Sequence, residues 1–130
     1  MRIYTLLKKI FDKVKSISTS LTSVPVTLTV YSNRVTDVSY YARYYPFSGM
    51  VFCRIYGILD FEPGTGDDYW IFRVSDTYAP GARYALATYS ASRNYRANIR
   101  SDGYVAIRKD STAQTMNGYA VYISGFWYVG

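Results

Sequence analysis

A chain of 130 residues has room for one domain and a short appendage, and it is long enough to bury a hydrophobic core. Its aromatic fraction of 18% is high and comes mostly from 16 tyrosines, which favour strands and are common on binding surfaces. The net charge of +6 lies mainly in residues 1–24, so the rest of the chain is nearly balanced and lacks a strong nucleic-acid footprint.

Residues 1–24 have the pattern of a coiled-coil stalk. The apolar positions of its heptad repeat are Leu7, Val14 and Leu21 at a, with Ile3, Ile10, Ile17 and Val24 at d. Leucine at a with isoleucine at d disfavours parallel dimers and favours three or more helices. Tyr4, Leu6 and Phe11 lie at e and g and widen the apolar stripe. We therefore expect a homotrimer whose interface includes Ile3, Leu7, Ile10, Val14, Ile17 and Leu21.

The stalk is expected to end between residues 18 and 22. Residues 16–23 are rich in serine and threonine, which are poor helix formers, and Pro25 prevents the helix from continuing. A second interpretation is a basic amphipathic helix that lies on an anionic membrane or in a groove of a partner. Met1 already lies within the first heptad, so a third possibility is that the stalk is cut from a longer fibre.

Residues 25–130 are predicted to form a β-sandwich head. Apolar and polar residues alternate over 26–31, 51–56, 70–75, 95–100 and 121–129, which is typical of half-buried strands. Asp102-Gly103 predicts a tight hairpin, and Asn117-Gly118 precedes the last strand. About eight strands separated by such turns indicate an antiparallel sandwich of jelly-roll type.

The last strand carries aromatic side chains on both faces, at Phe126, Trp127 and Tyr128. A sandwich strand needs only one buried face, and in a trimer the neighbouring chains can cover the other. We therefore expect these three residues in the trimer interface, with the last strand and strand 51–59 near the three-fold axis. The alternative is that loops of the same chain cover the second face.

Several kinds of chemistry are excluded by composition. The sequence contains no histidine, which removes histidine-dependent nucleophilic systems and histidine zinc sites. The lone Cys53 lies in an apolar run and is expected to pack as a small hydrophobic residue. We expect no enzyme, no catalytic residues, no cofactor and no metal.

The chain also carries no recognisable targeting segment. No apolar run approaches the length of a membrane span, and lysines interrupt the N-terminal apolar residues, unlike in a signal peptide. We expect a protein that is made in a cytosol and is not inserted into a membrane.

Carboxylates gather at Asp60, Glu62, Asp67 and Asp68 around a Pro-Gly-Thr-Gly loop. Such a cluster can be a solvated loop, a cation site or a pair of catalytic carboxylates. No diagnostic spacing separates these alternatives. A solvated loop is the interpretation we favour, and such a loop can also serve as a contact surface on a fibre head.

Two polar and aromatic segments are candidates for ligand contact, because such loop residues on a rigid sheet commonly carry recognition. Alternation places Trp70 and Tyr95 toward the core. The predicted ligand-binding residues are Asp67, Asp68, Tyr69, Arg93, Asn94 and Arg96.

The layout resembles phage trimeric fibre-tip and receptor-binding proteins, which carry a short coiled coil and a head related to the C1q and tumour-necrosis-factor jelly roll. The features that carry the resemblance are the heptads around Leu7–Lys15, the threonine-rich first strand and the final strand 120–129. The resemblance implies a virion protein that adheres to a bacterial surface saccharide or protein and contacts other virion proteins. The alternative is a purely structural trimerisation head or cap without a ligand.

Overall fold

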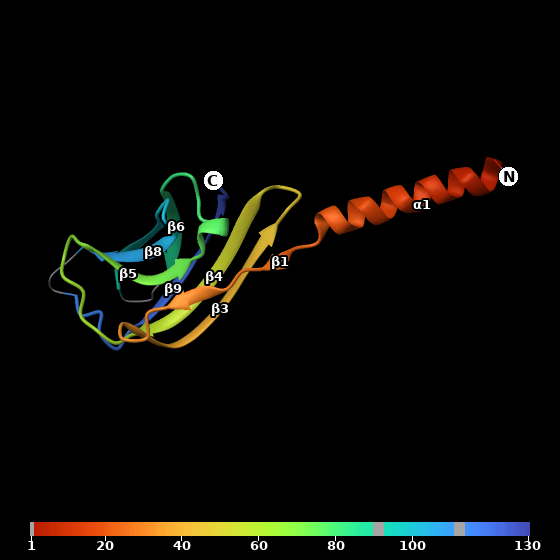
Figure 1. Cartoon of the computed structure of the whole chain (residues 1–130). Helices are drawn as coiled ribbons and strands as arrows, with labels where there is room; N and C mark the ends of the chain where they lie inside the picture. The colour runs from red at the N-terminus through yellow and green to blue at the C-terminus, as the bar shows by residue number, and fades with distance from the viewer. Residues whose placement is uncertain (1, 90–92, 111–113) are drawn as a thin grey trace.

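The structure is a computed structural model that describes residues 2–89, 93–110 and 114–130, leaving out the side chains of residues 16–21. In this part of the chain one helix is followed by an all-β head (Figure 1). The elements are α1 (Arg2–Leu21), β1 (Val24–Pro25), β2 (Leu28–Val30), β3 (Val35–Tyr45), β4 (Met50–Leu59), β5 (Asp68–Val74), the 3-10 turn η1 (Asp76–Tyr78), β6 (Tyr84–Tyr89), β7 (Tyr95–Ile99), β8 (Tyr104–Lys109) and β9 (Ala120–Tyr128).

The N-terminal helix extends away from the head as an arm (Figure 1). It ends at Leu21, within the predicted range. Four side chains of the predicted coiled-coil seam are described, and all are at least half exposed: Ile3, Leu7, Ile10 and Val14. The predicted seam residues Ile17 and Leu21 lie outside the described side chains. A helix without a partner for its apolar stripe is only marginally stable, and in the single chain this stripe is open to a contact from outside. Over the residues described, no helix is long and apolar enough to cross a membrane.

In the described residues the strands form one continuous sheet of nine strands in the order β1-β3-β4-β9-β6-β7-β8-β5-β2, and neighbouring strands are antiparallel throughout. The sheet curls over so that two halves enclose the core, which confirms a mainly β, sandwich-like head (Figure 1). The bend lies in β6, where Tyr84–Leu86 pair with β7 and Ala87–Tyr89 pair with β9. We call β1-β3-β4-β9-β6 the first half and β6-β7-β8-β5-β2 the second half.

The predicted strands and hairpin are present. Strands β2, β4, β5, β7 and β9 overlap the five alternating runs. Gly103 has a φ of +87°, which favours glycine, and a Cβ there would lie 2.3 Å from the Val74 carbonyl oxygen. Strands β3 and β6 lie outside these runs, because apolar and polar residues do not alternate clearly along them.

Cys53 lies in β4 with no exposed surface, as predicted. Burial raises the pKa of its thiol to about 12. The side chain therefore stays neutral and acts as a small hydrophobic residue.

Strand β5 contains an irregularity that changes which side chains face the core. The pairing with β8 shifts between Trp70 and Phe72, and both Ile71 and Phe72 are fully buried. An extra residue in a strand reverses the alternation on its two sides. The prediction that Trp70 points into the core is therefore wrong, whereas Tyr95 is buried as expected.

Candidate functional site

The outer surface of the first half is rich in tyrosine. Regular alternation in β4 and β9 turns every second side chain outward, and the pairing of β3, β4, β9 and β6 aligns these side chains in rows across the strands. We call this surface the tyrosine face; its main side chains are Ser39, Tyr41, Phe52, Arg54, Tyr56, Tyr89, Tyr122, Ser124, Phe126 and Tyr128.

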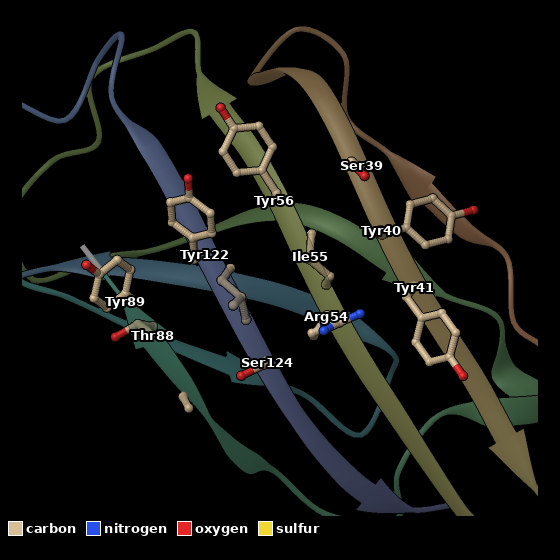
Figure 2. Close-up of a pocket in the computed structure, with 12 residues that line it drawn as sticks. Ser39, Tyr40, Tyr41, Arg54, Ile55, Tyr56, Thr88, Tyr89, Tyr122 and Ser124 are labelled. Atoms are coloured by element: carbon tan, nitrogen blue, oxygen red, sulfur yellow. The ribbon is translucent and has the colours of Figure 1, made fainter. Parts of the chain in front are cut away.

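A hollow of about 500 Å³ lies on the tyrosine face (Figure 2). One row brings Tyr56, Tyr122 and Tyr89 side by side, with ring centroids 4.9 and 5.8 Å apart. The next row contains the small side chains Ser124 and Ala87, which leave space beside the tall tyrosine rings. The hollow therefore follows directly from the alternation of large and small residues between neighbouring rows.

Of the described residues that line the hollow, Arg54 is the one that carries a charge. Its guanidinium carbon lies 5.8 Å from the centre of the Tyr41 ring, and no ion pair of Arg54 occurs within the described residues. The hollow is thus an aromatic surface with hydroxyl groups and a single cation. The chemistry of such a surface suits contact with another protein and contact with a polar ligand equally well.

The predicted interface residues of the last strand separate into two groups. Phe126 and Tyr128 are 58% and 55% exposed on the tyrosine face. Trp127 has no exposed surface, and its Nε1 donates a hydrogen bond to the Tyr78 carbonyl oxygen at 2.7 Å. A side chain that is fully buried within one chain has no surface left for a neighbour, so Trp127 belongs to the core of its own head.

The outer surface of the second half has a different character. Trp70, which the bulge turns outward, stacks on Tyr104 with ring centroids 4.4 Å apart, and Tyr104 in turn lies 6.2 Å from Tyr31. Arg100 lies over the Trp70 ring at 5.3 Å and Arg73 over the Tyr104 ring at 5.2 Å. We call this surface the arginine–tryptophan face; its side chains are Tyr31, Asp68, Trp70, Arg73, Arg83, Arg96, Asn98, Arg100, Tyr104 and Arg108.

The side-chain hydrogen bond between Tyr31 and Tyr104 raises the pKa of Tyr31. The phenol of Tyr31 therefore stays neutral at ordinary pH, and the stack presents neutral rings between cationic guanidinium groups.

A row of charges crosses the same face beside the aromatic stack. Asp68 in β5, Arg108 in β8 and Arg96 in β7 are aligned by strand pairing. Arg96 forms a close ion pair with Asp110 at 2.7 Å, and its hydrogen bond to that carboxylate lowers the pKa of Asp110. The contacts of Asp68 with Arg108 and Arg83 are longer, at 3.4 and 3.9 Å.

Two of the predicted ligand-binding residues, Asp68 and Arg96, therefore lie together on the arginine–tryptophan face. Asp67 is exposed at the start of β5. Tyr69 points inward, where it packs against the core and Phe61, and its hydroxyl accepts a hydrogen bond from the Gly64 N–H at 3.0 Å. Tyr69 thus holds the preceding loop in place and presents little surface to a ligand.

The predicted pair Arg93 and Asn94 lies just before β7 and contacts the segment before β9. Arg93 Nε donates to the Thr115 carbonyl at 2.6 Å, and its guanidinium lies 3.8 Å from the centre of the Tyr119 ring. The backbone of Asn94 exchanges two hydrogen bonds with the side chain of Gln114. These contacts fasten two loops to each other.

The sequence contained a partial signal for the arginine–tryptophan face. Arg100 and Tyr104 flank the predicted Asp102-Gly103 hairpin, which brings them to neighbouring strands. The shift in β5 that turns Trp70 outward has no local signal in the sequence.

The carboxylates of residues 60–68 do not act as one cluster, because Asp68 and Glu62 form ion pairs with different basic residues. Glu62 pairs with Lys109, whose Nζ lies 3.3 Å from Glu62 Oε2 and donates to the Gln114 carbonyl at 2.9 Å. Glu62 also accepts the Met116 N–H. Within residues 2–89, 93–110 and 114–130, no group of three or more histidine, cysteine, aspartate or glutamate residues is arranged to hold a metal.

The Glu62–Lys109 pair is expected to matter for stability, because Lys109 is only 5% exposed. Glu62→Ala is expected to lower the free energy of unfolding by about 2 kcal/mol, since it leaves a buried ammonium group and the Met116 N–H without their acceptor. Urea denaturation of Glu62→Ala and of Asp67→Ala, an exposed carboxylate of the same loop, provides the measurement and its control. Equal stability of the two variants would contradict a structural role for this pair.

Comparison with known proteins leaves the chain without an assigned relative. No model of a protein family matches it, and no curated protein is significantly similar to it in sequence. Function must therefore be argued from the two faces and the stalk.

Proposed function

We propose that the chain forms a homotrimeric, jelly-roll-type fibre tip of a phage virion that adheres to a saccharide or protein on a bacterial surface. The observation that carries the proposal is that one chain leaves two apolar surfaces open, the stripe on α1 and the tyrosine face. Large exposed apolar patches mark interaction surfaces in proteins.

The two open surfaces lie on elements that are connected to each other. The helix continues into β1, which pairs with β3 at the edge of the first half of the sheet (Figure 1). Three helices that associate through their stripes bring three tyrosine faces close to the same axis. The hollow beside Tyr122 has room for an aromatic side chain such as Phe126 of a neighbouring copy.

In such a trimer the arginine–tryptophan face lies on the opposite side of the sandwich and stays open. It carries Asp68 and Arg96 from the predicted ligand set, next to exposed aromatic and guanidinium groups. Three copies of a weak site on one axis raise the effective affinity by roughly 10²–10⁴ when they engage together. Trimerisation and adhesion therefore support each other.

The mass in solution tests the assembly. Light scattering is expected to give three times the 14.9 kDa of one chain at micromolar concentration. Removal of residues 1–20 is expected to weaken the trimer without abolishing it, because the tyrosine face still contributes. A monomeric intact chain would contradict the assembly, and a truncated chain that is fully monomeric would restrict it to the stalk.

Labelled trimer applied to a panel of bacterial cells tests adhesion. Specific, saturable binding to some strains is expected, and binding should weaken when the trimer is dissociated by dilution. A stable trimer that binds no cells would instead favour a structural head or cap without a ligand.

A further inference from the structure

We infer that the arginine–tryptophan face is a binding site for an acidic saccharide, one that carries carboxylate or phosphate groups. This inference rests on the proposed adhesive function and names the class of ligand and the site. Its first support is the exposed aromatic stack of Tyr31, Tyr104 and Trp70, in which Trp70 is 37% exposed. Aromatic rings of this kind offer apolar area to the C–H groups of a sugar at a low cost in side-chain entropy.

The second support is the charge of the face. Five arginines share four aspartates in its ion pairs, so one guanidinium charge is in excess among the described residues. Asp68 serves both Arg83 and Arg108 at distances beyond those of a strong hydrogen bond. Guanidinium groups with spare donors bind carboxylate and phosphate in a planar, two-pronged geometry.

The third support is a set of polar atoms without hydrogen-bond partners. In the described part of the chain these buried atoms are Arg73 Nε, Asn98 Oδ1 and Arg108 Nε, and all three belong to the arginine–tryptophan face. Arg108 Nε has the 3.4 Å ion-pair contact with Asp68 Oδ1, which is not a hydrogen bond. Buried polar atoms are normally paired, so three on one surface require an explanation. A saccharide supplies both kinds of partner, because its hydroxyls donate to an amide oxygen and its acidic groups accept from arginine.

The arrangement across the strands puts these groups within reach of one ligand. Strand pairing aligns Trp70 with Ala106 and Asn98, while Arg108 and Arg96 occupy the row beside them. Adjacent strands are about 4.8 Å apart, so the three strands present their side chains over roughly 10 Å. A ligand that bonds to Asn98 would also lie against the Trp70 ring, because Trp70 and Asn98 occupy the same row across Ala106.

Contact between the ligand and Trp70 provides a direct spectroscopic signal. The chain has two tryptophans, and Trp127 has no exposed surface. Binding is therefore expected to change the emission of Trp70 and to protect it from quenching by acrylamide, while Trp127 contributes a constant background.

The experiment applies the intact chain to immobilised acidic bacterial polysaccharides and to their neutral, carboxyl-reduced or dephosphorylated forms. We expect retention on at least one acidic polysaccharide, at least tenfold weaker binding to its neutral form, and weaker binding as salt is raised. Trp70→Phe and Arg100→Gln should each weaken binding at least tenfold, and Phe47→Ala, which removes an exposed aromatic ring in the turn between β3 and β4, should leave it unchanged.

The outcomes separate the site from the function. If no acidic polysaccharide is retained, or if the Trp70 and Arg100 variants bind as well as the intact chain, the inference is overturned. Adhesion to cells by the same variants would then leave the proposed function standing with a different site. Light scattering and circular dichroism on each variant exclude loss of binding through dissociation or unfolding.

Discussion

Replacing Trp127 with alanine is expected to lower the free energy of unfolding by about 3–5 kcal/mol, the largest effect of any single substitution considered. Trp127 in β9 lies opposite Val51 in β4, two strands in the interior of the sheet, and has no exposed surface. Its removal leaves a cavity in the core and also frees the Tyr78 carbonyl from its 2.7 Å hydrogen bond. Urea denaturation at fixed protein concentration measures the change, since assembly itself contributes to stability.

Trp127→Phe is the matched control for this substitution. It keeps an aromatic ring in the core and loses the Nε1 hydrogen bond, so a loss of about 1–2 kcal/mol is expected. A Trp127→Ala variant that is as stable as the intact protein would contradict the placement of the Trp127 side chain in the core.

Phe126→Glu is expected to shift the trimer to monomers at micromolar concentration. Phe126 is mostly exposed in a single chain, so the head itself should tolerate the change. In the proposed assembly the same residue meets a neighbour in each of the three contacts, and aromatic interface residues often contribute 2 kcal/mol or more each. Burial of a carboxylate in that contact adds a further penalty.

Light scattering and sedimentation over a range of concentrations measure this shift, with circular dichroism as a check on folding. Trp70→Glu is the control, because Trp70 is exposed on the opposite face of the sandwich. The two substitutions should have opposite consequences: Phe126→Glu removes the trimer, and Trp70→Glu retains the trimer and loses the ligand. A Phe126→Glu chain that remains trimeric would remove the tyrosine face from the interface.

The division between helix and β-head could be predicted from the sequence because periodicity is a local property. The repeat of 3.5 residues up to residue 21 and the alternation beyond Pro25 each reflect one element and need no knowledge of its neighbours. The hairpin at Asp102-Gly103 and the burial of Cys53 follow from the same kind of local chemistry. These features set the fold class and identified the open stripe of the stalk.

Which side chains form the two outer faces was decided only by the tertiary structure. One extra residue in β5 reverses its alternation, so Trp70 turns outward and Tyr69 inward, contrary to the simple pattern. The tyrosine face depends on the pairing of β3 with β4, of β4 with β9 and of β9 with β6. This pairing joins segments far apart in the chain and places Tyr41, Tyr122 and Tyr89 around one hollow.

Trp127 illustrates the same difference between what local sequence determines and what the tertiary structure decides. Its sequence neighbourhood marks a strand that is aromatic on both sides, but only the curl of the sheet puts this side chain inside and Phe126 outside. Likewise, the ion pair between the buried Lys109 and Glu62 joins residues that no local pattern connects. Local sequence thus determined which elements form, whereas long-range register and curvature decided which of their side chains meet and which remain available for binding.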